Sequence, residues 1–320
     1  MKRVAVLTLV FNNYGTRLQS YALCRVLNRI FKDEISVEVI NTEDAWSDRK
    51  SLRKYLVKNS FKGYGIKAFC HIFEVYRFLK ERRKILREDH SALKEKRASA
   101  FNKLNEMIPY TNFYSIKDIR MGKLPKYDAI IVGSDQVWNG IKVEAQDVYM
   151  LDILKDQKGL TYAASFGMTA IPKHMKLDYQ NRINNFSSLL IREKEGVEIC
   201  RQLGRDDAQL VLDPTLLLES ADYDELRTDN KVVDGDYLLV YSLNYSLKIY
   251  EEAYKLAKRY SYKMVVLKRS FCPPEISRYE EGIELYAESP ENFLSLIRNA
   301  RCIVTNSYHA LLFSKILLKN

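Results

Sequence analysis

Short runs of apolar residues alternate along this chain with longer segments in which apolar positions recur every three or four residues. Residues 2–10 form a nearly continuous apolar run, which is typical of a strand buried on both faces. A polar turn at 12–15 leads into residues 16–31, where the apolar positions have helical spacing, and residues 36–41 form a second apolar run. The order strand, helix, strand predicts a right-handed βαβ unit with parallel strands.

The same alternation resumes at residue 127 and continues to the C-terminus. It predicts a helix at 193–203 and four strands, at 127–132, 160–165, 188–192 and 209–212. After Asp213-Pro214-Thr215 a second series predicts strands at 237–243, 263–267 and 302–305, with helices at 247–260, 289–299 and from 309 onward. We therefore expect an α/β protein of two Rossmann-like, doubly wound domains, 1–215 and 216–320. Because the chain stops inside the last predicted helix, we expect the second domain to be incomplete.

A basic segment at residues 48–107 interrupts the alternation. Residues 48–103 hold 17 Lys and Arg against 6 Asp and Glu, a local charge of +11 in a chain whose total is +10. We expect two or three long helices here, inserted into the first domain. Phe69, Phe73 and Tyr76 lie at helical spacing beside a basic face, so this segment either contacts an anionic membrane peripherally or packs on the core as a solvated helical hairpin. We do not expect nucleic acid as a partner.

The composition excludes several classes of protein. The longest apolar runs are far shorter than the ~20 residues that a membrane-spanning helix needs, and the N-terminus has no signal-peptide pattern. Five cysteines are scattered without a C-x-x-C pair, so we expect neither a disulfide framework nor a zinc site, nor any other metal site. We expect a cytoplasmic protein, and the basic segment raises the alternative of a location at the inner face of the membrane.

The candidate chemistry lies at the predicted carboxyl ends of the strands, where open α/β sheets bind their ligands. The loop after the first strand has one glycine, which excludes both a G-x-G-x-x-G fingerprint and a Walker loop. Its helix start can still hold an anion through backbone N–H groups, although a plain turn capped by asparagine fits the same residues. Asp135 can orient a hydroxyl or act as a base, with Trp138 as a stacking platform; a loop carboxylate and a core tryptophan are the alternative.

Two further side chains follow apolar strands. Arg192 emerges from an apolar run, where a cation is costly to bury unless it meets an anion; that anion is a ligand or a neighbour such as Glu193 or Glu195. His309 stands where a helix begins, next to hydroxyl and amide side chains. Among the four histidines it is the best general acid or base, although a lone histidine is more often structural.

Taken together, the strand-end loops resemble those of the polysaccharide pyruvyl transferase family. The resemblance rests on six motifs in order, which cover nearly the whole chain apart from the basic segment: Asn13-Tyr14-Gly15 with residues 18–23, the loop 133–139, Ala164-Ser165-Phe166-Gly167, Arg192-Glu193, Leu212-Asp213-Pro214-Thr215, and the loop 305–309.

The resemblance implies a GT-B-like fold and transfer of a pyruvyl group from phosphoenolpyruvate onto a sugar of a bacterial-type exopolysaccharide or capsule, with formation of a ketal. It implies phosphoenolpyruvate as donor substrate, no further cofactor, and a sugar or lipid-linked oligosaccharide as acceptor. The implied roles are catalysis by His309 and Asp135, donor binding by Arg192, Asn13, Gly15, Thr16 and Arg17, and acceptor binding by Gln136, Trp138, Asn306 and Ser307. Two alternatives remain: a GT-B glycosyltransferase that uses a nucleotide sugar, and an inactive, truncated relative that acts as a binding partner.

Overall fold

The chain divides into two compact units in the computed structural model. Unit 1 comprises Met1–Tyr55 and Leu104–Leu218, and unit 2 comprises Leu56–Lys103 and Glu219–Asn320. The structure describes residues 1–43, 91–141, 143–154, 157–228, 231–243, 247–268 and 282–317. The chain passes from unit 1 to unit 2 after Leu218, whereas the sequence pattern placed the boundary after residue 215. The described part of the basic segment, 91–103, groups with unit 2 and not with the first domain as we expected.

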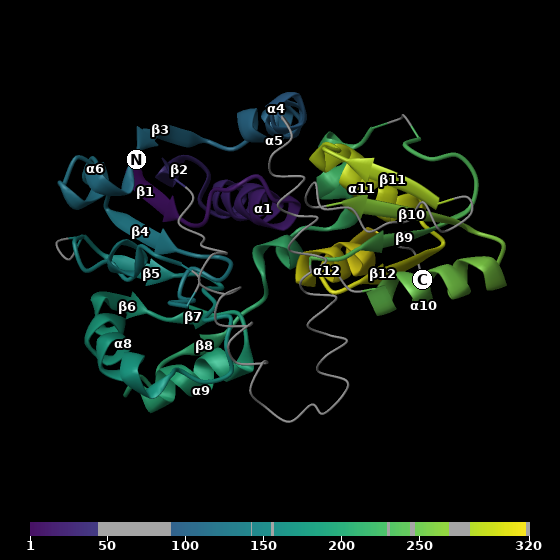
Figure 1. The fold of residues 1–320 in the computed structure, drawn as a ribbon. Helices are drawn as coiled ribbons and strands as arrows, with labels where there is room; N and C mark the ends of the chain where they lie inside the picture. The colour runs from purple at the N-terminus through teal and green to yellow at the C-terminus, as the bar shows by residue number, and fades with distance from the viewer. Residues whose placement is uncertain are drawn as a thin grey trace. The chain divides into compact units, whose positions relative to one another are not determined.

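Unit 1 is built on a six-stranded parallel sheet (Figure 1). The strand order is β3-β2-β1-β4-β5-β6, in which the chain moves outward in one direction from β1 and then in the other direction from β4. This is the strand order of the Rossmann fold. The strands are β1 (Lys2–Leu7), β2 (Ile35–Thr42), β3 (Tyr110–Tyr114), β4 (Ala129–Val132), β5 (Gly159–Thr161) and β6 (Phe186–Ser188).

Helices and short strands complete unit 1. A two-stranded parallel ladder joins β7 (Leu190–Ile191) to β8 (Gln209–Leu210), and single bridges at Ala164 connect Asp135 to Ile191. The longest of the described helices is α1 (Tyr14–Phe31), whose first half is buried against the sheet. The other described helices are α5 (Asn102–Glu106, which begins in unit 2), α6 (Ile116–Arg120), α7 (Gln146–Tyr149), α8 (Lys176–Arg182) and α9 (Lys194–Gln202). Short 3-10 turns are η1 (Lys32–Glu34), η2 (Lys173–Met175), η3 (Ile183–Asn185) and η4 (Pro214–Leu217).

Unit 2 holds a four-stranded parallel sheet in the order β11-β10-β9-β12. Its strands are β9 (Tyr237–Tyr241), β10 (Lys263–Lys268), β11 (Gly282–Tyr286) and β12 (Cys302–Thr305). Its helices are α4 (Ser91–Ser99), the 3-10 helix η5 (Ser220–Leu226), α10 (Leu247–Arg259), α11 (Pro290–Asn299) and α12 (Tyr308–Leu317). The order repeats the first four strand positions of unit 1, so the two units share one winding pattern.

Each unit has its own apolar core. In unit 1 the fully buried Trp138 ring lies 5.1 Å from the ring of Phe166 and 5.1 Å from that of Phe186. In unit 2 the ring of Phe293 packs edge-on against Tyr241 and Phe313. Because aromatic side chains bury large areas, these clusters hold helices to sheets and keep the ends of the strands in fixed positions.

Candidate functional site

The crevice expected in unit 1 lies between β1 and β4. The connection after β1 leads toward β2 on one side and the connection after β4 leads toward β5 on the other side. At such a switch point the two connections diverge and leave space outside the carboxyl ends of the strands. The loop after β1 ends at Asn13, and the first turn of α1 carries Thr16 and Arg17. The loop after β4 carries Asp135 and Gln136. The predicted donor and acceptor residues of unit 1 therefore border one switch point of the sheet, and Arg192 joins them from the end of β7.

Asp135 is held across this switch point by both neighbouring loops. Its Oδ2 accepts a hydrogen bond from Thr16 Oγ1 at 3.0 Å, and its Oδ1 accepts one from the Gln136 N–H at 2.9 Å. The backbone at Asp135 has φ of 72°, in the left-handed region that asparagine and aspartate tolerate better than most residues. The Ser165 N–H also donates to the Asp135 carbonyl at 3.0 Å. The carboxylate consequently has a defined orientation before any ligand binds.

A buried neutral network fixes the loop that precedes Asp135. Gln19 is fully buried; its Nε2 donates to Thr8 Oγ1 at 3.1 Å and its Oε1 accepts from the Ser134 N–H at 3.2 Å. Thr8 Oγ1 donates to the Ser134 carbonyl at 2.9 Å. At Gly133, with φ of 118°, a Cβ would lie 2.4 Å from the Tyr162 carbonyl oxygen. Only glycine fits this position, so α1 and the β4 loop form one rigid assembly.

Arg192 sits in a cluster of three carboxylates. Its side chain is 8% exposed and its nitrogens lie 3.3 Å from Asp213 Oδ2, 3.6 Å from Asp135 Oδ1 and 3.7 Å from Glu193 Oε2. The pair with Glu193 was one of the alternatives from the sequence; the other two partners were not foreseen. One guanidinium facing three carboxylates leaves the ionised cluster with a formal excess of negative charge, so Arg192 is committed to protein groups.

Asp213 is the central acceptor of this cluster. It is fully buried; its Oδ1 accepts from the Thr215 N–H at 3.0 Å and from Thr215 Oγ1 at 2.8 Å, and its Oδ2 accepts from Ser134 Oγ at 3.2 Å. Sequence reasoning quoted Asp213 within a motif but gave it no role. The available signal was an aspartate directly after a strand and before proline, where a buried carboxylate can cap the following turn.

Glu193 has an altered protonation equilibrium. Burial raises the pKa of its carboxyl above the ordinary value, and the neighbouring Arg192 guanidinium opposes that rise. Glu193 Oε1 accepts a hydrogen bond from the Phe166 N–H at 3.0 Å, which anchors the loop after β5 to the start of α9. Glu193 thus adds a second carboxyl group to this crevice beside the fixed Asp135, and its burial favours the protonated form.

Arg17 differs from Arg192 in its partners. It is also 8% exposed, but its guanidinium contacts the Tyr110 hydroxyl and Asn12 Oδ1, the latter at 3.1 Å. Its Nε is buried and has no hydrogen-bond acceptor among the described residues. Burial raises the pKa of Tyr110 and the nearby Arg17 charge opposes this. Arg17 is therefore a buried cation that forms no ion pair with any of the described residues.

Two predicted donor contacts are occupied by the helix itself. Asn13 is the N-cap of α1, and its Oδ1 accepts from the Gly15 N–H at 3.0 Å. The plain capped turn that we considered from the sequence is thus what the structure shows at Asn13 and Gly15. The expectation that the Gly15 N–H faces a phosphate is corrected, because that N–H already has an acceptor.

Among the predicted acceptor contacts in unit 1, one is wrong. Trp138 is fully buried in the core, and its Nε1 donates to the Tyr149 carbonyl at 3.0 Å, so neither face of the ring is open to a sugar. Gln136 is half-buried and its Oε1 accepts from Asn139 Nδ2 at 2.9 Å. A Cβ at Gly167 would lie 2.4 Å from Gln136 Oε1, so the backbone passes close to this amide.

The corresponding switch point of unit 2 lies between β9 and β12. Asn306 Oδ1 accepts from the Leu243 N–H at 2.7 Å, which joins the ends of the two strands. Ser307 precedes α12 and its Oγ accepts from the Ala310 N–H at 3.4 Å, as an N-cap does. His309 is 8% exposed, and its ring lies 5.3 Å from that of Tyr308. The predicted unit 2 residues thus gather at one strand end.

Tyr308 is a functional candidate that sequence reasoning missed. Its ring is 42% exposed at the first position of α12, beside the predicted catalytic histidine. An exposed aromatic ring at a strand end can pack against the apolar face of a sugar. The sequence signal was the aromatic residue directly before His309. The sequence instead suggested Trp138 as the stacking platform, and that ring is buried in the core.

The described residues contain no helix that is long and apolar enough to cross a membrane. They also contain no group of three or more His, Cys, Asp or Glu side chains arranged to hold a metal ion. The aromatic and basic face predicted around Phe69, Phe73 and Tyr76 lies outside the described residues, so the expected membrane-contacting helix remains a prediction.

Comparison with known proteins identifies the family and the fold. The family model described as polysaccharide pyruvyl transferase matches residues 13–317. No curated protein matches the chain in sequence. Among solved structures, UDP-GlcNAc 2-epimerase from Methanocaldococcus jannaschii is similar with 12% identity and a TM-score of 0.50, covering 98% of this chain and 81% of its own. An alpha-glucosyltransferase in complex with UDP and a 13-mer DNA is similar with 7% identity and a TM-score of 0.50, covering 99% and 78%. At these identities the likeness concerns the fold, which is GT-B-like.

Proposed function

We propose that this chain, which belongs to the polysaccharide pyruvyl transferase family, moves a pyruvyl group from phosphoenolpyruvate onto a sugar and forms a ketal. Family membership makes it a transferase; the donor and the acceptor are the proposal. One observation carries it. The matched range, 13–317, includes the loops at the switch points of both sheets, and the fixed carboxylate, the buried cation and the histidine that such a transfer needs all lie at these two points.

The donor is a small polyanion, with a carboxylate and a phosphate on adjacent groups. Of Arg17 and Arg192, Arg17 is the better counter-ion, because its guanidinium contacts a phenol and an amide. Arg192 already faces three carboxylates, so we assign it to positioning Asp135. Thr16 completes this arrangement by donating to the same carboxylate.

The chemistry needs two proton movements. A proton adds to the methylene carbon of the donor, and a sugar hydroxyl attacks the adjacent carbon. A second hydroxyl then displaces phosphate, so that of the two hydroxyl protons one balances the new C–H bond and the other leaves with phosphate. His309 is the proposed acid and base for these steps. Asp135 orients the acceptor hydroxyl, and Gln136, Asn306 and Ser307 bind the sugar.

The acceptor follows from the family name and not from a bound molecule. We propose a sugar of a bacterial-type exopolysaccharide or capsule, carried as a free or lipid-linked oligosaccharide. A lipid-linked acceptor would bring the protein to the inner face of the membrane, where the charge of +11 within residues 48–103 would favour anionic lipid. Binding to anionic vesicles that weakens with salt tests this part separately.

The first test is calorimetric titration of phosphoenolpyruvate into the unmodified protein and four variants. We expect Arg17→Gln to weaken binding at least about tenfold, as for loss of a charge-assisted contact, and Arg17→Lys to retain part of the affinity. His309→Ala should bind the donor but lose roughly 10²–10⁴-fold in turnover. His174→Ala is the matched control, since that histidine is exposed, and should be unchanged.

Two outcomes would decide against the proposal. Binding of a UDP-sugar in place of phosphoenolpyruvate would make the chain a nucleotide-sugar glycosyltransferase. Binding of neither, by a protein whose circular dichroism shows it to be folded, would favour a non-catalytic binding partner.

A further inference from the structure

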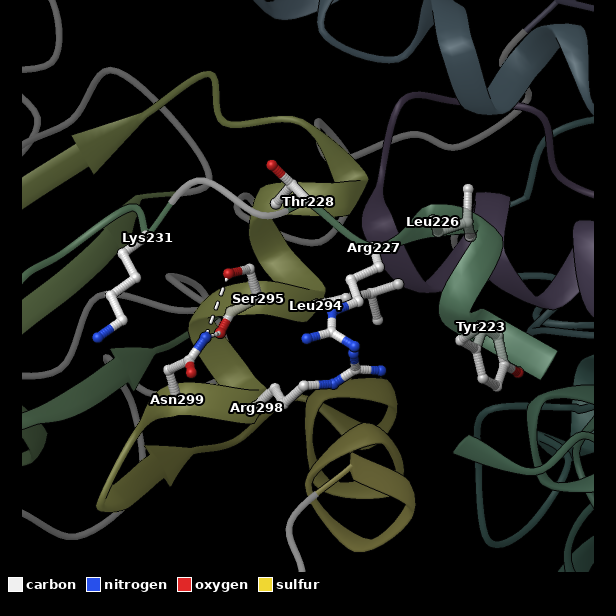
Figure 2. Close-up of a pocket in the computed structure, with 9 residues that line it drawn as sticks. All are labelled: Tyr223, Leu226, Arg227, Thr228, Lys231, Leu294, Ser295, Arg298 and Asn299. Atoms are coloured by element: carbon white, nitrogen blue, oxygen red, sulfur yellow. Dashed lines mark hydrogen bonds between the residues drawn. The ribbon is translucent and has the colours of Figure 1, made fainter. Parts of the chain in front are cut away.

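A second polar pocket lies in unit 2, away from its switch point. It has a volume of about 150 Å³ and lies between η5 and the last turns of α11 (Figure 2). Helix α11 ends at Asn299, just before β12 begins, whereas Ser307 and His309 follow the end of β12. The pocket is therefore at the opposite edge of the parallel sheet. It is lined by Tyr223, Leu226, Arg227, Thr228, Lys231, Leu294, Ser295, Arg298 and Asn299.

The lining carries three cations and no carboxylate. Arg298 Nη2 lies 3.3 Å from Asp224 Oδ1, but that carboxylate is 52% exposed and the pair is a weak surface one. Arg227 and Lys231 have no ion pair with any residue that the structure describes. Figure 2 shows the guanidinium groups of Arg227 and Arg298 pointing toward one another. Like charges brought together repel, and an anion between them would remove that repulsion.

The remaining polar groups do not compete for these cations. Asn299 Nδ2 donates to the Ser295 carbonyl at 2.8 Å and to Ser295 Oγ at 3.3 Å. The Ala300 N–H donates to the Ile297 carbonyl at 3.4 Å. Two of the last carbonyls of α11, which carry the negative end of the helix dipole, are thereby satisfied within the helix. Thr228 and Ser295 add hydroxyl groups to the lining.

The size of the pocket limits the ligand. Pockets that enclose drug-sized ligands measure ~300–1,000 Å³, so a volume of about 150 Å³ suits one phosphoryl group and not a whole nucleotide. Guanidinium groups match the oxygens of a phosphoryl group in pairs, which an isolated lysine cannot do. We propose that this pocket binds the phosphoryl group of a small soluble phosphate compound, through Arg227, Arg298 and Lys231, at a site separate from that of the proposed transfer.

The experiment is calorimetric titration of inorganic phosphate and of glycerol 3-phosphate at constant ionic strength. The background protein carries Arg17→Gln, so that the proposed donor site does not contribute. We expect saturable one-site binding. The compound that binds with the higher affinity shows whether the ligand is free phosphate or a phosphate ester. Arg227→Gln and Arg298→Gln should each weaken binding at least about fivefold, and the double variant at least about tenfold.

Arg259→Gln is the matched control, because it removes one exposed positive charge from the same unit without touching the pocket. Affinity equal to the background protein is expected there. No saturable binding of either compound, or an equal loss in Arg259→Gln and Arg227→Gln, would overturn the proposal. Since the side chain of Arg227 is exposed, its replacement should leave the fold intact. The outcome of the phosphate titration does not depend on whether phosphoenolpyruvate binds at the proposed transfer site.

Discussion

The switch points of the two sheets have the same topology and different polar contents. In unit 1 the strand ends surround a cluster of ions, with Arg192 facing Asp135, Glu193 and Asp213. In unit 2 the end of β12 carries Thr305, Asn306, Ser307 and His309, which are hydroxyl, amide and imidazole groups. The winding of the chain thus determines where a crevice forms, and the side chains at its edge determine whether ion pairs or hydroxyl and amide hydrogen bonds hold that edge together.

The difference also predicts how each crevice responds to mutation. Removal of Asp213 leaves Arg192 and three further hydrogen-bond donors without their buried acceptor, whereas removal of the Ser307 cap leaves one N–H without its acceptor. We therefore expect the larger losses of stability in unit 1.

Asp213→Ala should have the largest effect. It removes the acceptor of four hydrogen bonds and leaves Arg192 without its nearest carboxylate, so we expect a loss of about 3–5 kcal/mol in the free energy of unfolding, measured by urea denaturation. Asp147→Ala, which breaks a surface pair with Arg120, is the control and should cost about 1 kcal/mol or less. Equal losses for both would show that the unit 1 cluster is not a coupled buried network.

Gly133→Ala should come next, with Gly235→Ala as its counterpart in unit 2. Both glycines have positive φ, of 118° and 80°, but only at Gly133 would a Cβ clash with backbone. We expect a cost of about 3 kcal/mol at Gly133 and about 1 kcal/mol at Gly235, measured by thermal unfolding. A small cost at Gly133 would mean that the loop before Asp135 can shift.

Ser307→Ala tests the unit 2 side and should cost about 1 kcal/mol, with Ser307→Gly costing only a few tenths. In Ser307→Ala we expect faster hydrogen exchange of the first amides of α12, because the Ala310 N–H loses its acceptor. Unchanged exchange in Ser307→Ala would show that this serine does not stabilise the helix start.

The smallest effect concerns pH. Because burial raises the pKa of Glu193, the folded state holds this proton more tightly than the unfolded state. Its contribution to stability is therefore greatest at low pH and declines as the pH rises from the ordinary pKa of 4.5 through the raised value. Glu193→Gln should flatten that decline in urea titrations at several pH values. An unchanged slope would mean that Arg192 fully offsets the effect of burial.

The sequence predicted well the strands that are continuous apolar runs, and it missed strands without such a run. β1, β9 and β12 are nearly continuous apolar runs, and their predicted positions agree with the structure to within a few residues. β3 and β11 were missed because they are the edge strands of their sheets, with partly exposed residues and no clear apolar run. The strands predicted at 188–192 and 209–212 are shorter in the structure, at Leu190–Ile191 and Gln209–Leu210.

For the candidate site, the sequence located the loops but not their internal partners. The strand-end position of Asp135, Arg192 and His309 follows from the pattern of strands alone. That Trp138 packs inward, and that Asp213 meets Arg192, depends on how segments far apart in sequence come together. Likewise, the sequence does not tell that carboxylates surround Arg192 whereas a phenol contacts Arg17.

Asp213 has one more consequence, for the path of the chain. It is followed at once by the turn Pro214–Leu217, and unit 2 begins at Glu219. The segment that leaves unit 1 therefore starts from a carboxylate that accepts hydrogen bonds from Ser134 and Arg192 at the unit 1 crevice. A ligand that draws Arg192 away from Asp213 would thus remove one of the side chains that fix the last turn of unit 1.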